Sequence, residues 1–310
     1  DDMDIEYLGG ELASTAGEAT ALDCISPMHL KMMECAYYSR CATAYLDIPR
    51  SLPRKDVYNE SESHKGYAQM LSTFEPDNSG FDVNSSLYAT HSALFAPWAQ
   101  YKYVGTAKYN VAPPSFLALM IQRSMVLNQS AQYEWIQPTS RTHSVKIVKP
   151  EYKVPKKVLD VWQPTDEQGG CGVNVITDIP GMGICLWGNQ TLFNNPVATY
   201  QALRNLSTRH LVCAIEDAVY KAGIRITFQY NNQSAYSMFH AGVTPLLDTM
   251  RNVGAIEDYY VTMNHDLDAL GMVKANSVVG KIYIVPQGVI DKITVDLIAL
   301  PPGSDLTPYM

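Results

Sequence analysis

Hydrophobic side chains recur at every third or fourth position in four segments of this 310-residue chain, and that spacing predicts helices. The expected helices are 28–39, 115–127, 208–222 and 234–253. Alternating or continuous apolar runs predict strands. The expected strands are 42–48, 84–98, one that ends at Trp187, 224–230, 259–264, 278–285 and 292–300. The pattern therefore predicts a chain of the α/β class.

Residues with special backbone or capping properties indicate where the helices begin and end. Ser115 is placed to cap the second helix, and Ser207 or Thr208 is placed to cap the third. Pro245 is expected to kink or divide the fourth helix, and Gly254 suits its C-terminal cap. The helix limits are therefore expectations that rest on local sequence.

Changes in composition along the chain predict two domains. Residues 1–22 are acidic and weakly periodic, which is typical of an irregular lead-in, and 146–168 form a basic connector interrupted by proline. A glycine-rich segment at 169–172 marks the expected junction between a first domain, 1–165, and a second domain, 169–310. The chain begins Asp-Asp without methionine, so we expect a trimmed protein that lacks a terminal arm and associates weakly.

The composition is that of a globular protein and narrows the range of partners. Hydrophobic residues make up 46% of the chain, and the net charge is -8 without a basic stripe, so nucleic-acid binding is disfavoured. No run of about 18 apolar residues occurs, so we expect no membrane insertion.

The residues that could form a catalytic or metal site also have plainer structural interpretations. His91 and Ser92 are adjacent on an expected strand, so their side chains would point to opposite faces. No G-x-S-x-G turn occurs. The spacing of Cys24, His29, Cys35 and Cys41 fits none of the usual zinc sites, so we expect no metal there. The cysteines are expected to be buried free thiols. Residues 264–268 are expected to form a polar loop. We therefore expect no catalytic, cofactor-binding or metal site, and no enzyme.

One stretch, 184–220, combines the local signals in an unusual order. An apolar strand ends in Trp187-Gly188, a polar turn carries Asn189-Gln190-Thr191, and a linker leads to Arg209-His210 at a helix start. This series resembles the beginning of the C-terminal domain of contractile-tail sheath proteins. Further segments match sheath motifs in the family's order: 45–49, 96–98, 111–118, 133–138, 228–232 and 254–261. The chain thus resembles the tail sheath family of contractile-tailed bacteriophages, especially the sheaths of giant phages.

The resemblance implies a fold, a function and a set of partners. The fold would be a two-domain α/β protein, with a non-catalytic subtilisin-like domain followed by an α+β sheath C-terminal domain. The subunit would polymerise around the tail tube in stacked helical rings and contract to drive the tube through the host envelope. Its partners would be copies of itself, the tail tube protein, and the baseplate and tail terminator proteins. It would be found in the virion tail, and in the host cytoplasm during assembly.

Two other functions remain open from the sequence. The chain is also compatible with the sheath of a phage-derived bacteriocin or of a type VI secretion system. A more remote alternative is a hydrolase with a cysteine or serine nucleophile, which would need a nucleophile, a base and an orienting group within mutual reach.

The expected helix 208–222 supplies most of the candidate interface residues. Its apolar positions follow helical spacing, so the polar positions lie towards another face. The candidates for contact with the tube or a neighbouring subunit are Arg204, Arg209, His210, Glu216, Asp217 and Lys221. Arg209 opposes the positive end of the helix dipole and therefore needs a partner, either on another subunit or within the chain, such as Asp217.

Overall fold

The structure is a computed structural model that describes part of the chain. The described residues are 18–50, 67–68, 71–72, 87–102, 109–127, 147–155, 159, 162, 172–179, 183–193, 201–267 and 273–288. The expected strand 292–300 and the predicted junction at 169–171 lie outside the described residues.

The described residues form both helices and strands, in agreement with the prediction of a mixed fold. The helices are α2 (Glu18–Ser39), α4 (Pro114–Leu127), α6 (Leu206–Ile226) and α7 (Gln233–Asn252), with short 3-10 helices η1 (Leu87–His91) and η2 (Gln201–Arg204). The strands are β1 (Ala44–Asp47), β2 (Ser92–Ala96), β3 (Ala99–Lys102), β4 (Tyr109–Ala112), β5 (Ile147–Pro150), β6 (Val173–Ile179), β7 (Gly183–Trp187), β8 (Ile256–Leu267) and β9 (Val273–Pro286).

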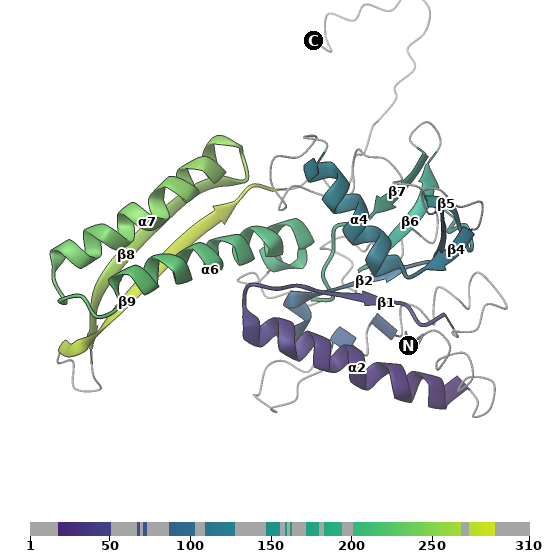
Figure 1. Cartoon of the computed structure of the whole chain (residues 1–310), viewed down its shortest axis with the longest axis horizontal. Coiled ribbons are helices and arrows are strands. Elements are labelled where there is room, and N and C mark those ends of the chain that lie inside the picture. The colour runs from purple at the N-terminus through teal and green to yellow at the C-terminus, as the bar shows by residue number, and fades with distance from the viewer. Residues whose placement is uncertain are drawn as a thin grey trace, which may run out of the picture.

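A four-stranded sheet with the order β1-β2-β6-β7 forms the centre of one part of the molecule. The pairs β1–β2 and β2–β6 are parallel, and β6–β7 is antiparallel. A smaller antiparallel sheet, β4-β3-β5, lies beside it. Together with α2 and α4 these strands form a unit that we call the sheet body (Figure 1).

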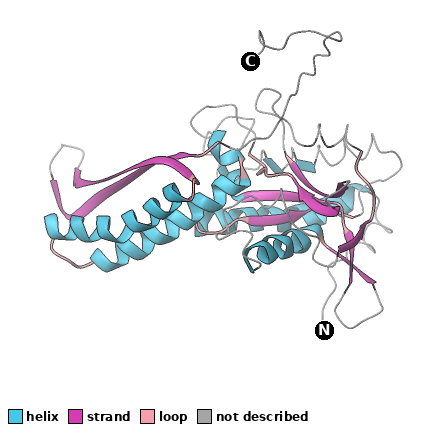
Figure 2. Cartoon of the chain, turned by 90° about the horizontal axis from the view of Figure 1, so that it is seen from above, coloured by secondary structure: helices cyan, strands magenta, loops and turns pink. Residues whose placement is uncertain are grey.

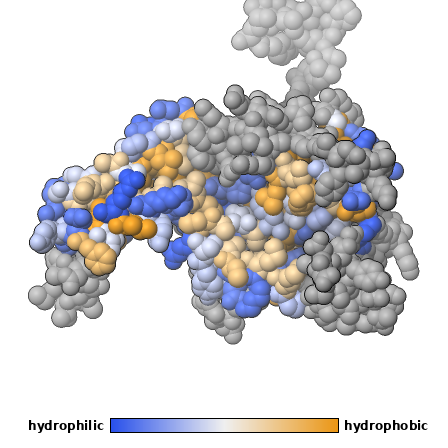
Figure 3. All heavy atoms as spheres, viewed as in Figure 1, coloured by the Kyte–Doolittle hydropathy of each residue, from blue (hydrophilic) through white to orange (hydrophobic). Residues whose placement is uncertain are grey.

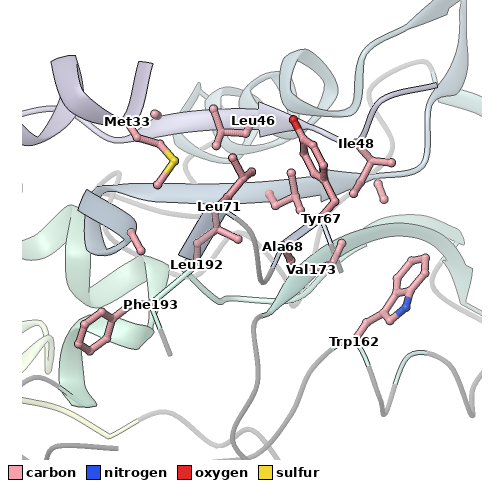
Figure 4. Packing of buried hydrophobic residues seen from close by; sticks show 14 of the residues in the cluster. Met33, Leu46, Ile48, Tyr67, Ala68, Leu71, Trp162, Val173, Leu192 and Phe193 are labelled. Atoms are coloured by element: carbon pink, nitrogen blue, oxygen red, sulfur yellow. The ribbon is translucent and has the colours of Figure 1, made fainter. Parts of the chain in front are cut away.

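Both faces of the central sheet are buried, because side chains of alternating parity face two separate clusters. Leu46, Leu94 and Val173 belong to the cluster that packs under α2, part of which Figure 4 shows. Tyr45 and Phe95 belong to the cluster that packs under α4. This double coverage explains why the strands read as nearly continuous apolar runs.

The remaining elements form an extension that projects from one side of the sheet body (Figures 1 and 2). It consists of the antiparallel helices α6 and α7 and the two-stranded ribbon β8-β9. Its cluster contains Leu211, Ile215, Phe239 and Val243, with Ile282 packed against them from the ribbon. Leu206, at the first position of α6, belongs instead to the cluster under α4. One continuous helix therefore joins the extension to the sheet body.

The first core cluster and the central sheet are continuous across the predicted domain junction. β2, which precedes the junction, pairs with β6, which follows it. Leu192 and Phe193 pack with Met33 and Leu46 in the same cluster. The division at 165–169 stays a prediction, and these contacts link the two ranges.

Several predicted elements are confirmed, and four are wrong in extent or type. The strand expected at 84–98 begins as the 3-10 helix η1, and the connector at 146–168 contains β5. α2 begins at Glu18, inside the expected irregular lead-in. The strand expected at 224–230 is wrong because α6 continues to Ile226, and Thr227 then donates its N–H to the carbonyl of Gly223.

The predicted caps were partly wrong, because groups distant in sequence supply them. Pro114 is the first residue of α4, and Ser115 donates its N–H and hydroxyl to the Asp47 carboxylate at 2.7 and 2.8 Å. α7 continues unbroken through Pro245. The Gly254 prediction is confirmed: its φ is +79°, and its N–H donates to the carbonyl of Arg251.

Candidate functional site

The start of α6 is held by the polar turn that precedes it in the sequence by about twenty residues. The Asn189 side-chain oxygen accepts the Ser207 N–H at 3.0 Å, and its side-chain nitrogen donates to the Ser207 hydroxyl at 2.9 Å. The Asn189 carbonyl accepts the N–H of Leu206 at 3.0 Å. The helix N-cap residue, Asn205, makes no side-chain cap bond. The prediction that Ser207 or Thr208 caps the helix is therefore wrong, and Asn189 takes that role.

The turn itself is fixed by buried hydrogen bonds. Asn174 on β6 donates to the Gln190 carbonyl at 2.8 Å and accepts the Gln190 N–H at 2.9 Å. Thr191 donates its N–H to the carbonyl of Arg204 at 2.7 Å. A Cβ at Gly172 would lie 2.1 Å from the side chain of Gln190, so this position requires glycine. The sheet body therefore sets the position at which α6 begins.

Replacing Asn189 with alanine is expected to lower the free energy of unfolding by about 1–2 kcal/mol, because the Ser207 N–H at the helix start loses its acceptor and the Ser207 hydroxyl loses its donor. Guanidinium unfolding followed by circular dichroism measures this loss. Asn252→Ala, at the exposed end of α7, is the matched control, with an expected change within about 0.5 kcal/mol. Equal losses in the two variants would contradict the assigned role.

Arg209 is buried and is held within the chain. Its side chain is 4% exposed, and one guanidinium nitrogen donates to Glu216 at 2.8 Å. The same nitrogen lies 3.4 Å from the carbonyl oxygen of Arg40, which it approaches as a donor. Burial raises the pKa of Glu216, an effect that the Arg209 charge opposes. Of the two alternatives that the sequence left open, the intrachain pair is present, and its acid is Glu216 where Asp217 was suggested.

His210 belongs to a closed hydrogen-bonded ring that links three elements. Tyr45 on β1 donates to Gln122 Oε1 on α4 at 2.8 Å, and Gln122 Nε2 lies 3.1 Å from His210 Nδ1. His210 Nε2 lies 3.2 Å from the Tyr45 hydroxyl. The two rings are stacked, with their centroids 6.0 Å apart. Because the Gln122 amide donates to Nδ1, Nε2 carries the proton and donates to Tyr45. His210 therefore fastens α6 to both β1 and α4.

The other candidate interface residues differ in exposure. Arg204 is 9% exposed. Asp217 and Lys221 pair on the surface of α6, with 45% and 67% of their side chains exposed. The side chain of Glu216 is 36% exposed, which is less than that of Asp217 or Lys221. Among the six candidates, Asp217 and Lys221 are thus the charged groups most available to a partner, while the role of the set stays a prediction.

The candidate nucleophiles contact the backbone of neighbouring segments. The Ser92 hydroxyl donates to the carbonyls of Tyr88 and Ala89 at 3.3 Å. His91 Nδ1 lies 2.9 Å from the Thr90 hydroxyl, and burial together with the Arg209 charge lowers the pKa of His91 to about 4. Cys213 Sγ lies near backbone carbonyls at the end of α2. These contacts hold segments together, and none of them joins a nucleophile to a histidine.

Two of the four described thiols depart from the prediction of burial. Cys185 and Cys213 are buried as expected, whereas Cys35 and Cys41 are exposed. The described side chains contain no cluster of three His, Cys, Asp or Glu residues that would hold a metal ion. Among the helices of the described ranges, none has the length and hydrophobicity that a membrane crossing requires.

The fold belongs to a class found in contractile injection assemblies. A chain of the PVC sheath complex, from an extracellular contractile injection system in its contracted state, aligns with a TM-score of 0.54 and 18% identity, over 67% of this chain and 56% of that chain. A chain of the anti-feeding prophage baseplate gives the same TM-score at 15% identity. This alignment covers 80% of this chain and 67% of that chain.

Sequence comparison leads to a narrower group. A tail sheath protein of Vibrio phage KVP40 is 24% identical over 136 residues, which are 43% of this chain and 19% of that protein. A tail sheath protein of Salmonella phage ViI is 26% identical over 137 residues, 44% of this chain and 21% of that protein. The matches thus span about a fifth of each relative. No family model matches the chain. The resemblance to phage tail sheath proteins is confirmed.

Proposed function

We propose that this chain is a structural subunit of a contractile phage tail sheath that polymerises around the tail tube and contracts to drive the tube through the host envelope. The observation that carries the proposal is the agreement of two independent comparisons. The sequence matches proteins named tail sheath, and the fold matches a chain of a contracted sheath complex. In this role the chain acts in the virion tail after assembly in the host cytoplasm.

Polymerisation into a helical sheath requires unlike surfaces that meet head to tail. The extension offers such a surface, because it carries the exposed charged pair Asp217–Lys221 and several exposed apolar side chains. Hydrophilic and hydrophobic side chains lie side by side on the face of the extension that Figure 3 shows. The exposed apolar side chains near its tip are Tyr220, Ile224, Phe228 and Tyr230. Contraction then follows as rigid-body rotation between two packings of the same subunits, without nucleotide.

The ribbon β8-β9 supplies a second feature suited to assembly. Within the described residues its two strands pair with each other alone, so each outer edge lacks a neighbouring strand. Tyr260 and Tyr283 stack on its outer face, while Val261 and Ile282 face the helices. An extended terminal arm of a neighbouring subunit would add a strand here through backbone hydrogen bonds. The tail tube, baseplate and tail terminator proteins are the other proposed partners.

The alternatives make different predictions. A bacteriocin or secretion-system sheath would share this fold, and the genes that neighbour the coding sequence discriminate it from a phage tail. The relatives favour a structural role, whereas a hydrolase would lose a measurable activity on Ser92→Ala or Cys213→Ala substitution. We propose that the chain is not an enzyme and needs no cofactor.

Electron microscopy of the full-length protein with its natural termini tests the proposal. Expressed together with its tail tube protein, it is expected to form striated tubes of stacked rings. Discrete globular particles under the same conditions, combined with hydrolysis of an ester or peptide substrate that Ser92→Ala or Cys213→Ala abolishes, would overturn it.

A charge reversal on α6 tests whether this helix faces a partner. Lys221→Glu is expected to leave folding intact, because its side chain is 67% exposed, and to raise the protein concentration at half-maximal assembly on tubes about 5-fold. The fold-change should shrink at high salt, because counterions screen contacts between exposed charges. Arg251→Glu, on α7 and 48% exposed, is the matched control. Wild-type assembly by Lys221→Glu would exclude α6 as the contact surface.

A further inference from the structure

Two cysteines lie together at the joint between the sheet body and α6. The sulfur of Cys213, on α6, lies 3.5 Å from the carbonyl oxygen of Arg40 and 3.9 Å from that of Ala42. It also lies 3.9 Å from the Thr43 hydroxyl. Arg40 and Ala42 are the residues on either side of Cys41. The buried thiol of α6 is therefore surrounded by the backbone that carries the exposed Cys41.

Covalent geometry converts these contacts into a limit on the distance between the two residues. The carbonyl oxygen of one residue and the Cα of the next are fixed on the same planar peptide unit, about 3 Å apart. The sulfur of Cys213 therefore lies within about 6.5 Å of the Cα of Cys41. The Cα of Cys213 lies about 3 Å from its own sulfur, so the two Cα atoms are at most about 9 Å apart. Disulfides join Cα atoms that are about 4.4–6.8 Å apart, so the segment 40–43 must move towards α6 for the bond to form.

The charged and thiol groups that shift the pKa of Cys41 belong to α6. Loss of water around the thiol raises its pKa first, and the carboxylates of Asp217 and Glu216 raise it further. Cys213 and Lys221 are the remaining groups that act on it, so all four groups belong to α6.

We propose that Cys41 and Cys213 are a redox-active dithiol that a small-molecule disulfide oxidises to an intramolecular disulfide. The Cys41 thiolate attacks one sulfur of oxidised glutathione, and one glutathione thiolate leaves and takes up a proton. The Cys213 thiolate then attacks the Cys41 sulfur of the mixed disulfide and displaces the second glutathione. The two protein thiols lose two electrons and two protons, and one glutathione disulfide becomes two thiols.

Exposure decides the order of the two steps. Cys41 is exposed and accepts the oxidant, whereas Cys213, 8% exposed, is shielded from a molecule as large as glutathione and acts as the resolving thiol. Because the raised pKa of Cys41 keeps the thiolate fraction low at neutral pH, oxidation is slow at pH 7 and faster at pH 9.

The bond would fasten the extension to the sheet body. The neighbours of Cys41 lie 173 and 171 positions before Cys213 in the sequence, so the disulfide closes a long loop. It lies beside the Arg209 contact with Arg40, which joins the same two segments. Oxidation therefore adds a covalent link to a joint that the start of α6 and side-chain contacts such as Arg209–Arg40 already hold.

Oxidation of the reduced full chain by millimolar oxidised glutathione, at pH 7 and pH 9, tests the proposal. Peptide mapping by mass spectrometry without reductant is expected to find a Cys41–Cys213 crosslink, formed faster at pH 9. The Tm should rise by about 5 °C and return to its starting value with dithiothreitol. Cys41→Ser and Cys213→Ala should each abolish the crosslink and the shift, while Cys35→Ser, an exposed control, should retain both.

Three outcomes would overturn the proposal. One is a stable glutathione adduct on Cys41 while Cys213 remains reduced. Another is a crosslink that joins either residue to a different cysteine, such as Cys24 or Cys171. The third is the absence of any oxidation of Cys41 at pH 9. Cys41→Ser alters an exposed side chain, so it keeps the comparison valid if Cys213→Ala fails to fold.

Discussion

Replacing Glu216 with lysine is expected to lower the free energy of unfolding by about 3 kcal/mol. The substitution removes the carboxylate that pairs with Arg209 and places a second cation beside a guanidinium that is 4% exposed. The buried Arg209 would keep only its long contact with the Arg40 carbonyl. Chemical denaturation of the full chain measures the loss, and the slope of the transition should remain unchanged.

Asp217→Lys is the matched control, because it changes the net charge by the same amount at the neighbouring position. Asp217 is 45% exposed and pairs only with the exposed Lys221 in the contacts described for it, so its reversal should cost less than about 1 kcal/mol. A Glu216→Lys variant as stable as Asp217→Lys would show that the Arg209 pair does not stabilise the fold. Asp217→Lys also separates stability from assembly, since it reverses an exposed charge on α6 with little expected loss of stability.

Lowering the pH from 6.5 to 4 is expected to destabilise the fold through His29 and His91. Burial lowers the pKa of each from 6.5 to about 4 in the folded chain, so the unfolded chain binds more protons within this window. Each histidine therefore lowers the free energy of unfolding by up to about 3 kcal/mol as the pH falls. Asp47 acts in the opposite direction, because burial outweighs its two hydrogen bonds from Ser115 and raises its pKa from 3.8 to about 6.

Two variants separate these contributions in unfolding experiments at several pH values. His29→Gln should flatten the loss of stability between pH 6.5 and 4, because one titrating group is removed. Asp47→Asn should steepen it, because the opposing group is removed while an amide oxygen can still accept the Ser115 N–H. Parallel pH curves for the three proteins would contradict both assignments.

Patterns that involve only near neighbours in the chain determined much of this protein. The 3.6-residue spacing placed α4, α6 and α7 because each helix buries one continuous stripe of its own side chains. Gly254 ends α7 as expected, since a positive φ is a property of the local backbone. The ordered motifs around Trp187 and Arg209 also determined the sheath resemblance without any structure.

The tertiary structure decided every feature that joins distant segments. Strand order is one of them, because β2 pairs with β6 across nearly eighty residues and no local pattern encodes that choice. The cap of α6 is another, since Asn189 reaches Ser207 only after the turn is docked on the sheet. Arg209 looked like a surface charge on the helical pattern, and it is buried because the segment after α2 covers it. Local periodicity defines which face of a helix is apolar, whereas the packing of distant segments decides which polar side chains that face also buries.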